Sequence, residues 1–395
     1  MTQDHSTQSI AVIGAGAMGS GIAQVAAQAG HPVILFDRST SALQRSEQQL
    51  QKIAKRQVEK GRWSNETSKT IQQLITRTEE IEKIAGCILI IEAIVEDFQA
   101  KTSLLQIVES QVGADSIIAT NTSSLSVTAI AGQLKHPERC IGLHFFNPAP
   151  LMALVEIVPA LQTDNGIKHQ CHELMCSWGK SPVIAKDTPG FIVNRLARPF
   201  YGEALRIAEE GLYGHETIDS AMRAVGFRMG PFELMDLIGN DINYAVTCTV
   251  FEAFYFDPRY RPSLIQKQHV DAGWLGKKTS RGYYNYNPAG SRLESNTNQI
   301  AESEHSLIIS NRIVAMLINE AADALRLNIA QESDLEIAMT KGVNYPKGLL
   351  AWANEWGIAN VLKELEYLQK NFGEERYRPS PLLKQKVEEG TLFHV

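Results

Sequence analysis

The chain has 395 residues, of which 44% are hydrophobic and 21% are charged, and its formal net charge is −6. This length has room for two or three domains, and the lack of a basic excess argues against a nucleic-acid-binding protein. The polar start MTQDHSTQS lacks the apolar segment of a secretory signal, and the longest apolar run, residues 88–95, is too short to span a bilayer. Five scattered cysteines do not indicate a disulfide framework. We therefore expect a cytoplasmic protein without a membrane partner.

Residues 10–37, IAVIGAGAMGSGIAQVAAQAGHPVILFD, predict a strand, a glycine-rich turn, a helix and a second strand. The first glycine permits a tight turn, the second lets the backbone approach a pyrophosphate, and the third lets helix and strand pack closely. The phosphates of a dinucleotide would then bind at the positive end of the helix dipole. The predicted cofactor contacts in this turn are Gly14, Gly16, Ala17, Met18 and Gly19.

Asp37 ends the second of these strands, 18 residues after Gly19. This spacing is near that at which a carboxylate accepts hydrogen bonds from the adenosine ribose. A carboxylate there would repel a 2′-phosphate, so Asp37 favours NAD over NADP, although the neighbouring Arg38 weakens that preference. The sequence therefore predicts an NAD-binding domain.

Residues 41–78 form a polar tract with apolar residues at helical spacing. The chain between Asp37 and the next apolar run is longer than one crossover helix requires, so we expect a helical hairpin inserted into the sheet domain. The hairpin carries basic residues, among them Lys55 and Arg56. They fit either a solvated helix face or a binding place for the phosphates of a long anionic substrate.

Short apolar runs then alternate with helical patterns, which predicts a buried parallel sheet with ligands at the carboxyl ends of its strands. The runs are residues 87–95, 116–120 and 140–145. Glu96 follows the first run, a stretch that contains Ser123 follows the second, and His144 lies at the end of the third. We expect the next strand, residues 154–159, to be antiparallel to the strand that carries His144.

His144 lies in LHFFNP, at the end of an apolar strand where a solvated surface histidine is not expected. A neutral imidazole accepts a proton at physiological pH, so His144 is the predicted base. Glu156 is the only charge in the run LVEIV, and antiparallel pairing would bring its carboxylate to the imidazole. The structural alternative for His144 is a hydrogen-bonded core residue.

The pattern changes at residues 188–190 and is helical from residue 191 onward, and the final third of the chain repeats it at an offset of 117 residues. Asn194-Arg195 matches Asn311-Arg312, and Glu203-Ala204 matches Glu320-Ala321. We predict a Rossmann-type doubly wound α/β sheet followed by two related all-α domains. The expected boundaries are 1–188 with the hairpin insertion 41–78, then 189–287, a linker at 288–305, and 306–395.

Six stretches resemble the 3-hydroxyacyl-CoA dehydrogenase family: GAGAMGSGIAQ, IEAIVED, ATNTSSL, GLHFFNPAPLMALVEIV, KDTPGFIVNRL and MGPFELMDLIG. The repeated helical unit also resembles the C-terminal domain of that family. The resemblance implies reversible oxidation of an (S)-3-hydroxyacyl-CoA by NAD to the 3-oxoacyl-CoA. It places the reaction in fatty-acid degradation (β-oxidation), aromatic-acid degradation or short-chain acyl-CoA metabolism. The length of the acyl chain, and whether it ends in a second carboxylate, are open at this point.

The resemblance also implies residue roles. His144 takes the hydroxyl proton, Glu156 orients its ring, Ser123 bonds the substrate hydroxyl near the nicotinamide, and Asn194 helps to hold the reacting group. The other implied contacts are Glu96, Lys101, Asn147 and Lys278 for the cofactor, and Arg56 with Lys55 for the CoA phosphates. Structural alternatives are a helix N-cap for Ser123, helix packing for Asn194 and a solvated loop position for Lys278.

A metal site is not expected. His169, Cys171, His172 and Cys176 include potential ligands, but only His172 and Cys176 would share one helix face. Hydride transfer to NAD needs no metal. Two other functions are alternatives: a β-hydroxyacid dehydrogenase acting on free acids, which generally uses a lysine as base, and a non-catalytic NADH-binding structural relative. Small members of the family dimerise through the helical domain, so the second helical unit is expected to act as an internal pseudo-dimer partner, in a monomer or a homodimer.

Overall fold

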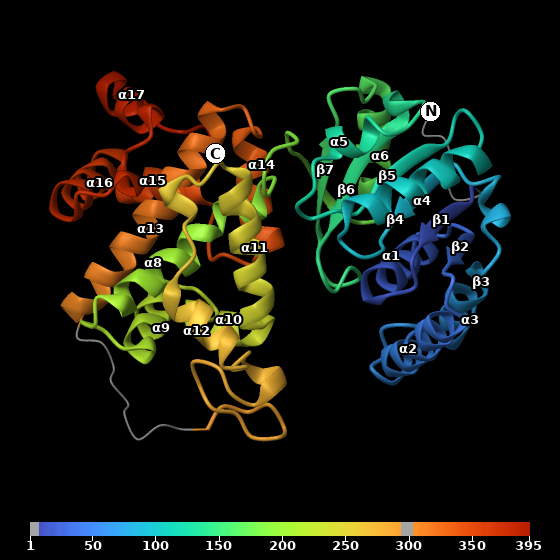
Figure 1. The fold of residues 1–395 in the computed structure, drawn as a ribbon, viewed down its shortest axis with the longest axis horizontal. Coiled ribbons are helices and arrows are strands. Elements are labelled where there is room, and N and C mark those ends of the chain that lie inside the picture. Colours follow the sequence, from blue (N-terminus) through green and yellow to red (C-terminus); the bar gives the residue numbers. More distant parts are fainter. Residues whose placement is uncertain (1–7, 294–302) are drawn as a thin grey trace. The chain divides into compact units, whose positions relative to one another are not determined.

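The computed structural model describes residues 8–293 and 303–395, which fall into two compact units, Met1–Phe191 and Ile192–Val395 (Figure 1). Among the residues so described, no helix is long and apolar enough to cross a membrane.

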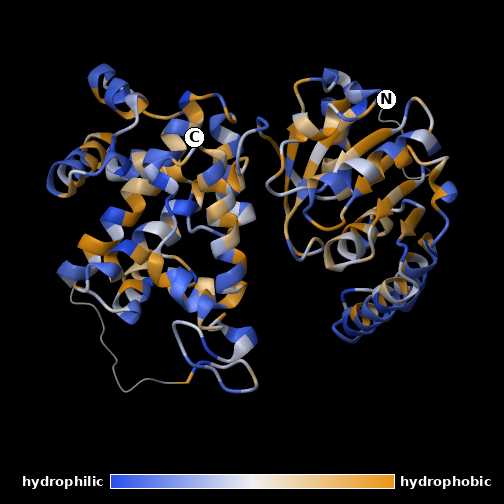
Figure 2. Ribbon diagram, viewed as in Figure 1, coloured by the Kyte–Doolittle hydropathy of each residue, from blue (hydrophilic) through white to orange (hydrophobic). Residues whose placement is uncertain are grey.

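The first unit is built on one eight-stranded sheet in the order β3-β2-β1-β4-β5-β6-β7-β8. Neighbouring strands are parallel except β6 and β7, which are antiparallel. The central strands are buried along their whole length because they are continuous apolar runs, and they stand out as hydrophobic in Figure 2. The strands are β1 (Ile10–Ile13), β2 (Val33–Phe36), β3 (Ile75–Thr78), β4 (Leu89–Glu92), β5 (Ile117–Thr120), β6 (Cys140–Phe145), β7 (Leu154–Pro159) and β8 (Ser181–Ile184).

Six α-helices connect these strands. They are α1 (Ala17–Gln28), α2 (Thr40–Glu59), α3 (Asn65–Leu74), α4 (Phe98–Gln111), α5 (Val127–Ala131) and α6 (Asn165–Ser177). Side-chain caps fix where five of them begin. Ser39 accepts a hydrogen bond from the Ala42 amide at the start of α2, and the equivalent caps of α3, α4, α5 and α6 are Ser64, Asp97, Ser126 and Asp164. Helices α2 and α3 form the expected hairpin.

The end of the predicted hairpin insertion is not helical, and for these residues the prediction is wrong. Ile75–Thr78 is the edge strand β3, which pairs in parallel with β2. Three of its four residues, Ile75, Thr76 and Thr78, are β-branched and favour a strand. The hairpin therefore returns the chain to the sheet edge.

The second unit is helical and contains the same arrangement twice. The first copy consists of α7 (Val193–Leu196), α8 (Arg198–Glu209), α9 (His215–Ala224), α10 (Pro231–Ile238), α11 (Asn240–Ala253), a 3₁₀ turn (Pro258–Tyr260) and α12 (Leu264–Asp271). The second consists of α13 (Ser303–Arg326), α14 (Glu332–Ile337) continued by a π-turn (Ala338–Gly342), α15 (Leu349–Trp356), α16 (Ile358–Phe372), a 3₁₀ turn (Glu375–Tyr377) and α17 (Pro381–Glu389). Of the predicted linker 288–305, residues 294–302 lie outside the described residues.

The long helix α13 packs against α8 and α9 and carries a buried carboxylate, Glu320, into the first copy. Glu320 accepts hydrogen bonds from Arg195 Nε and Tyr260 Oη, each at 2.6 Å, and its other oxygen lies 3.1 Å from Arg259 Nη1. Burial opposes ionisation of Glu320, but the two arginines outweigh it, so the pKa of this carboxyl is lowered.

Glu203 on α8 makes the reciprocal set of contacts with the second copy. It accepts from Arg312 Nε at 3.1 Å and from Tyr377 Oη at 2.9 Å, and it lies 3.2 Å from Arg376 Nε. Each of these partners stands at the repeat offset from a partner of Glu320. The two copies therefore meet through a self-complementary interface, the kind that joins the subunits of a two-fold dimer.

Candidate active site

The turn between β1 and α1 leaves room for a ligand at one glycine only. A Cβ on Gly14, whose φ is +105°, would lie 2.7 Å from the Ala93 carbonyl oxygen, and one on Gly19 would lie 1.8 Å from the Gly14 carbonyl oxygen. Nothing lies within 4 Å of a Cβ built on Gly16, which is the N-cap of α1 and has no side chain to bond the first amides. Gly14 and Gly19 thus serve close packing, and Gly16 faces the space that a pyrophosphate needs.

Asp37 lies at the end of β2, beside this turn. Its two carboxylate oxygens accept hydrogen bonds from the Ala15 amide at 2.7 Å and the Ser39 amide at 2.8 Å. It lines a cavity of about 280 Å³ together with Arg38, Ile94 and Ser103. The residues at this strand end therefore fit the adenosine end of a dinucleotide.

Glu96 ties together the loops that follow β4 and β5. Its Oε1 accepts hydrogen bonds from Thr122 Oγ1 at 2.6 Å, the Ser123 amide at 2.8 Å and the Ser124 amide at 3.1 Å. Its Oε2 lies 3.2 Å from Lys101 Nζ. Burial raises the pKa of Glu96, but Lys101 and the hydrogen bonds outweigh that effect and lower it, so Glu96 is ionised and holds Ser123 in place.

Lys101 lies beneath this loop layer and not on its surface. Its ammonium pairs with Glu92 Oε1 at 2.7 Å, and the two side chains are 1% and 0% exposed. Thr120 Oγ1 donates to the other oxygen of Glu92 at 2.7 Å. Lys101 can therefore serve a cofactor by positioning Glu96, and direct contact would require it to leave this ion pair. Glu92 was not predicted as a site residue. Its position as a charged residue inside an apolar run could have indicated such a role.

Ser123 does not cap α5, so that alternative is wrong. The cap is Ser126, whose hydroxyl accepts from the Ala129 amide at 3.1 Å. Asp187 also accepts hydrogen bonds from the amides of Val127 and Thr128. Ser123 remains half-buried at the carboxyl end of β5, where the sequence predicts a ligand-binding position.

His144 and Glu156 face each other across β6 and β7. They are directly opposite in the antiparallel register, and His144 Nδ1 lies 2.6 Å from Glu156 Oε2. The side chains are 8% and 0% exposed. The predicted pairing of these strands and side chains is confirmed. Because Nδ1 bonds the carboxylate, Nε2 is the nitrogen that carries the lone pair of the neutral ring.

Aromatic rings and a fixed loop surround this pair. The imidazole centroid lies 4.4 Å from that of Phe146 and 5.9 Å from that of Phe191. The Phe145 amide donates to Asn121 Oδ1 at 2.8 Å, which joins the ends of β5 and β6. These contacts hold the imidazole in an apolar setting next to the loop that carries Ser123.

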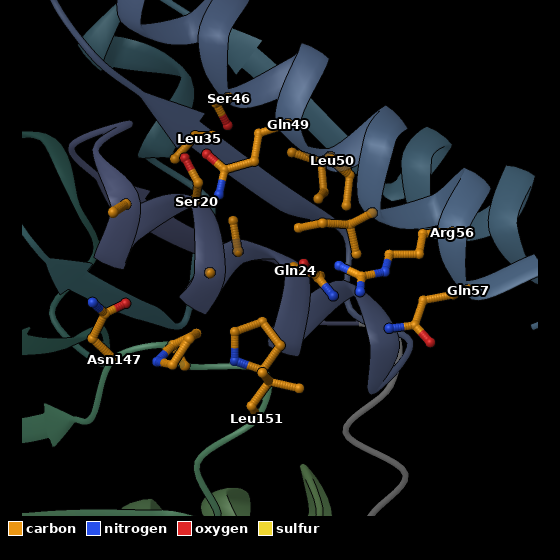
Figure 3. A pocket seen from close by; sticks show the side chains of 18 of the residues that line it. Ser20, Gln24, Leu35, Ser46, Gln49, Leu50, Arg56, Gln57, Asn147 and Leu151 are labelled. Atoms are coloured by element: carbon orange, nitrogen blue, oxygen red, sulfur yellow. The ribbon is translucent and has the colours of Figure 1, made fainter. Parts of the chain in front are cut away.

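A second cavity of the first unit, about 440 Å³ in volume, lies between α1, α2 and the loop that contains Asn147. Figure 3 shows the guanidinium of Arg56 pointing into it, with Asn147 and Leu151 on the opposite wall. Its basic lining residues are Arg56, Lys60, Arg62 and Arg77. Lys55 is exposed and is not among the residues that line it, whereas Arg77, on strand β3, was missed because that segment was expected to be helical.

The other predicted residues belong to the second unit. Asn194 lies on α7, half-buried, and its carbonyl accepts a hydrogen bond from Arg198 Nε at 3.0 Å. Lys278 follows α12, and its ammonium bonds both oxygens of Asp241 at 2.6 and 2.7 Å. Lys278 is thus an ion-pair partner of α11, and its role toward a cofactor stays a prediction.

The four potential metal ligands on α6 do not point toward one common position. His172 Nδ1 and Cys176 Sγ are 3.9 Å apart on one face, whereas Cys171 is fully buried. His169 points to Glu173 at 3.9 Å. The helix therefore offers a pair of ligands and not a closed site.

Comparison with known proteins matches both units to domains of one protein family. The family model described as the NAD binding domain of 3-hydroxyacyl-CoA dehydrogenase matches residues 9–188. The model of the C-terminal domain of the same family matches twice, at residues 190–286 and 308–393. The helical repeat is thus two copies of one family domain.

Individual relatives agree with these matches. A 3-hydroxyadipyl-CoA dehydrogenase of Escherichia coli K12 is 39% identical over 96% of this chain and 97% of its own. A 3-hydroxybutyryl-CoA dehydrogenase of Clostridioides difficile is 39% identical over 70% of this chain and 99% of its own. The crystal structure of a 3-hydroxybutyryl-CoA dehydrogenase from E. coli K12 superposes with a TM-score of 0.89 at 38% identity, covering 97% of this chain and 99% of that one.

Proposed function

Because this chain belongs to the 3-hydroxyacyl-CoA dehydrogenase family, a family of NAD-dependent oxidoreductases, we propose that it oxidises (S)-3-hydroxyacyl-CoA thioesters reversibly with His144 as the general base. The observation that carries the proposal is the buried 2.6 Å bond between His144 Nδ1 and Glu156. NAD, when bound, supplies the acceptor for the hydride that leaves C3.

The base works through the fixed tautomer of its ring. Glu156 holds a proton on Nδ1, so Nε2 accepts the proton of the substrate hydroxyl as the carbonyl forms. The carboxylate then stabilises the resulting imidazolium without taking up the proton itself. Ser123 bonds the substrate hydroxyl, and Asn194 holds the reacting group. Both side chains are neutral, which suits the polarisation of an oxygen that must be released.

The remaining site residues bind the two large ligands. Gly16, Asp37, Glu96 and Asn147 hold NAD, with Lys101 acting through Glu96. Arg56 lines the 440 Å³ cavity and binds CoA phosphates. Lys60, Arg62 and Arg77 line the same cavity and add positive charge that favours an anionic ligand.

The proposed acyl group is short. Relatives of this chain carry names with a four-carbon hydroxybutyryl and a six-carbon hydroxyadipyl group. The reaction would then belong to fatty-acid or aromatic-acid degradation or to short-chain acyl-CoA metabolism. A reducing compartment, the cytoplasm, suits its thiols: Cys87, Cys140 and Cys171 are free and buried, and burial raises the pKa of Cys87 to about 11.

Substrate-dependent formation of NADH tests the function. We expect the absorbance of NADH to rise with (S)-3-hydroxybutyryl-CoA and NAD, to rise much more slowly with NADP, and to stay flat with free 3-hydroxybutyrate. Turnover of the free acid at a comparable rate would favour a β-hydroxyacid dehydrogenase. NADH binding without any turnover would favour a structural relative.

We further propose that the second helical copy takes the place of a partner subunit. This proposal is supported by the reciprocal contacts of Glu203 and Glu320. It is also supported by a shorter relative, because 70% of this chain already covers 99% of that protein. Deletion of residues 306–395 uncovers the apolar face of α8 and the buried Glu203, so we expect aggregation or a new dimer in size-exclusion chromatography. A stable monomer after the deletion would contradict it.

A further inference from the structure

Arg198 on α8 is buried, and no carboxylate of the described residues lies within ion-pair distance of it. Among the residues that the structure describes, seven arginines are buried, and Arg198 is 7% exposed. The other six each have a carboxylate oxygen within ion-pair distance: Arg139, Arg195, Arg206, Arg259, Arg312 and Arg376. Burial lowers the pKa of Arg198, and only Tyr201 and Tyr345 oppose that effect. A guanidinium remains charged at neutral pH, so this site holds an uncompensated buried cation.

The groups around Arg198 orient it without neutralising it. Nε donates to the Asn194 carbonyl at 3.0 Å, Nη1 donates to Thr247 Oγ1 at 3.0 Å, and the Tyr201 ring centroid lies 5.0 Å from Cζ. Two of the five guanidinium hydrogens are thereby used. Arg198 is also the first residue of α8, where the helix dipole disfavours a cation and favours an anion.

A second unpaired donor belongs to the same neighbourhood. Tyr345, from the second helical copy, is 6% exposed, and its hydroxyl has no hydrogen-bond partner within the described part of the chain. Arg198 and Tyr345 are close enough for each to shift the pKa of the other. A buried hydroxyl and a buried guanidinium, both with unused hydrogens, are the donors that a carboxylate requires.

The second copy of the repeat shows that packing does not require this arginine. Ala315 stands at the repeat offset from Arg198, on α13, and is fully buried. Asn311 stands at the same offset from Asn194. The helix therefore packs well with a methyl group at this position, and the arginine occurs in the copy that carries the substrate-binding asparagine of the proposed function.

We propose that Arg198, assisted by Tyr345, binds the terminal carboxylate of a dicarboxylic acyl-CoA and makes this enzyme selective for substrates of the 3-hydroxyadipyl class. The inference rests on the proposed function, in which Asn194 holds the reacting group. Arg198 lies four residues after Asn194, across the junction between α7 and α8, and four helical residues rise by about 6 Å. In a six-carbon dicarboxylic chain the carboxylate lies three bonds of about 1.5 Å beyond C3, so the reach of the substrate suits this spacing.

The test compares two thioesters of equal length, (S)-3-hydroxyadipyl-CoA and (S)-3-hydroxyhexanoyl-CoA, which differ by a carboxylate in place of a methyl group. We expect the wild-type protein to prefer the adipyl substrate in kcat/KM by about 10- to 100-fold, the value of a charge-assisted hydrogen bond. Arg198→Met should remove this preference, mainly through loss of the adipyl reaction. Arg198→Lys should restore part of it, and Tyr345→Phe should reduce it by less. Arg326→Met, at a half-exposed arginine on α13, is the matched control and should keep it.

The possible results distinguish failure of the proposed carboxylate site from failure of the proposed function. Equal use of both thioesters by the wild-type protein would overturn the inference and leave the function standing, and this comparison needs no variant to fold. An equal loss on both substrates in Arg198→Met would also overturn it, because it would show a role in holding Asn194 alone. A protein inactive with these thioesters and with 3-hydroxybutyryl-CoA would overturn the proposed function.

Discussion

The two copies of the helical domain share the residues that join them and differ at the position four residues after their equivalent asparagines. Glu203 and Glu320 occupy equivalent positions on α8 and α13, and each holds two arginines and a tyrosine of the other copy. Arg198 and Ala315 also occupy equivalent positions, yet one is a buried cation and the other a methyl group. Duplication has therefore preserved the contacts that join the copies, while the residue four positions after the equivalent asparagines differs.

The largest expected effect concerns the shared positions. Glu203→Ala and Glu320→Ala each leave buried arginines without their carboxylate, so we expect each to lower the free energy of unfolding by about 3–5 kcal/mol. Urea denaturation followed by circular dichroism measures this change. Glu389→Ala, on the exposed face of α17, is the control and should change it by less than about 0.5 kcal/mol. If one of the two buried glutamates proves dispensable, the two halves of the interface are not equivalent.

The next effect separates the two asparagines. Asn194→Ala should lower kcat/KM for 3-hydroxyacyl-CoA by about 100-fold, or about 2.7 kcal/mol of transition-state stabilisation. Asn311→Ala should leave kcat/KM within about threefold of wild type, because its copy has no sheet domain of its own. Steady-state kinetics on both variants, at matched melting temperature, checks the pair. Equal losses would mean that the asparagine serves helix packing in both copies.

A smaller effect sharpens the comparison through pH. Asp219 caps α10 through the Phe232 and Glu233 amides, and burial raises its pKa from 3.8 to about 7. Between these values the folded protein holds a proton that the unfolded chain has lost, so this group makes stability fall as pH rises from about 4 to about 7. The slope is about 1 kcal/mol per pH unit, which amounts to about 2 kcal/mol between pH 4.5 and pH 6.5.

Asp219→Asn should remove this slope, measured as the difference between variant and wild-type unfolding free energies at about pH 4.5, 5.5 and 6.5. Glu336 caps α15 at the equivalent position and its pKa is also raised by burial. It is less buried than Asp219, so Glu336→Gln should remove a smaller slope. Parallel curves for Asp219→Asn and wild type would contradict this account.

The features that the sequence predicted are those in which one local pattern determines the result. The glycine turn and the pairing of His144 with Glu156 follow from residues whose spacing and alternation specify strands and their neighbours. Strand β3 was not predicted because its four residues, three of them β-branched, stand at the end of a tract whose apolar residues have helical spacing. The burial of Lys101 and the missing carboxylate at Arg198 could not be predicted, since a sequence does not show which cation meets which carboxylate in space.

In the proposed reaction, an imidazole that a buried carboxylate holds in place removes the hydroxyl proton. The most direct measurement is kcat for NADH formation from (S)-3-hydroxybutyryl-CoA by His144→Ala, with NADH affinity and melting temperature measured on the same sample. We expect kcat to fall by about 10²- to 10⁴-fold while NADH affinity is preserved. A folded variant whose kcat stays within about threefold of wild type would contradict this expectation.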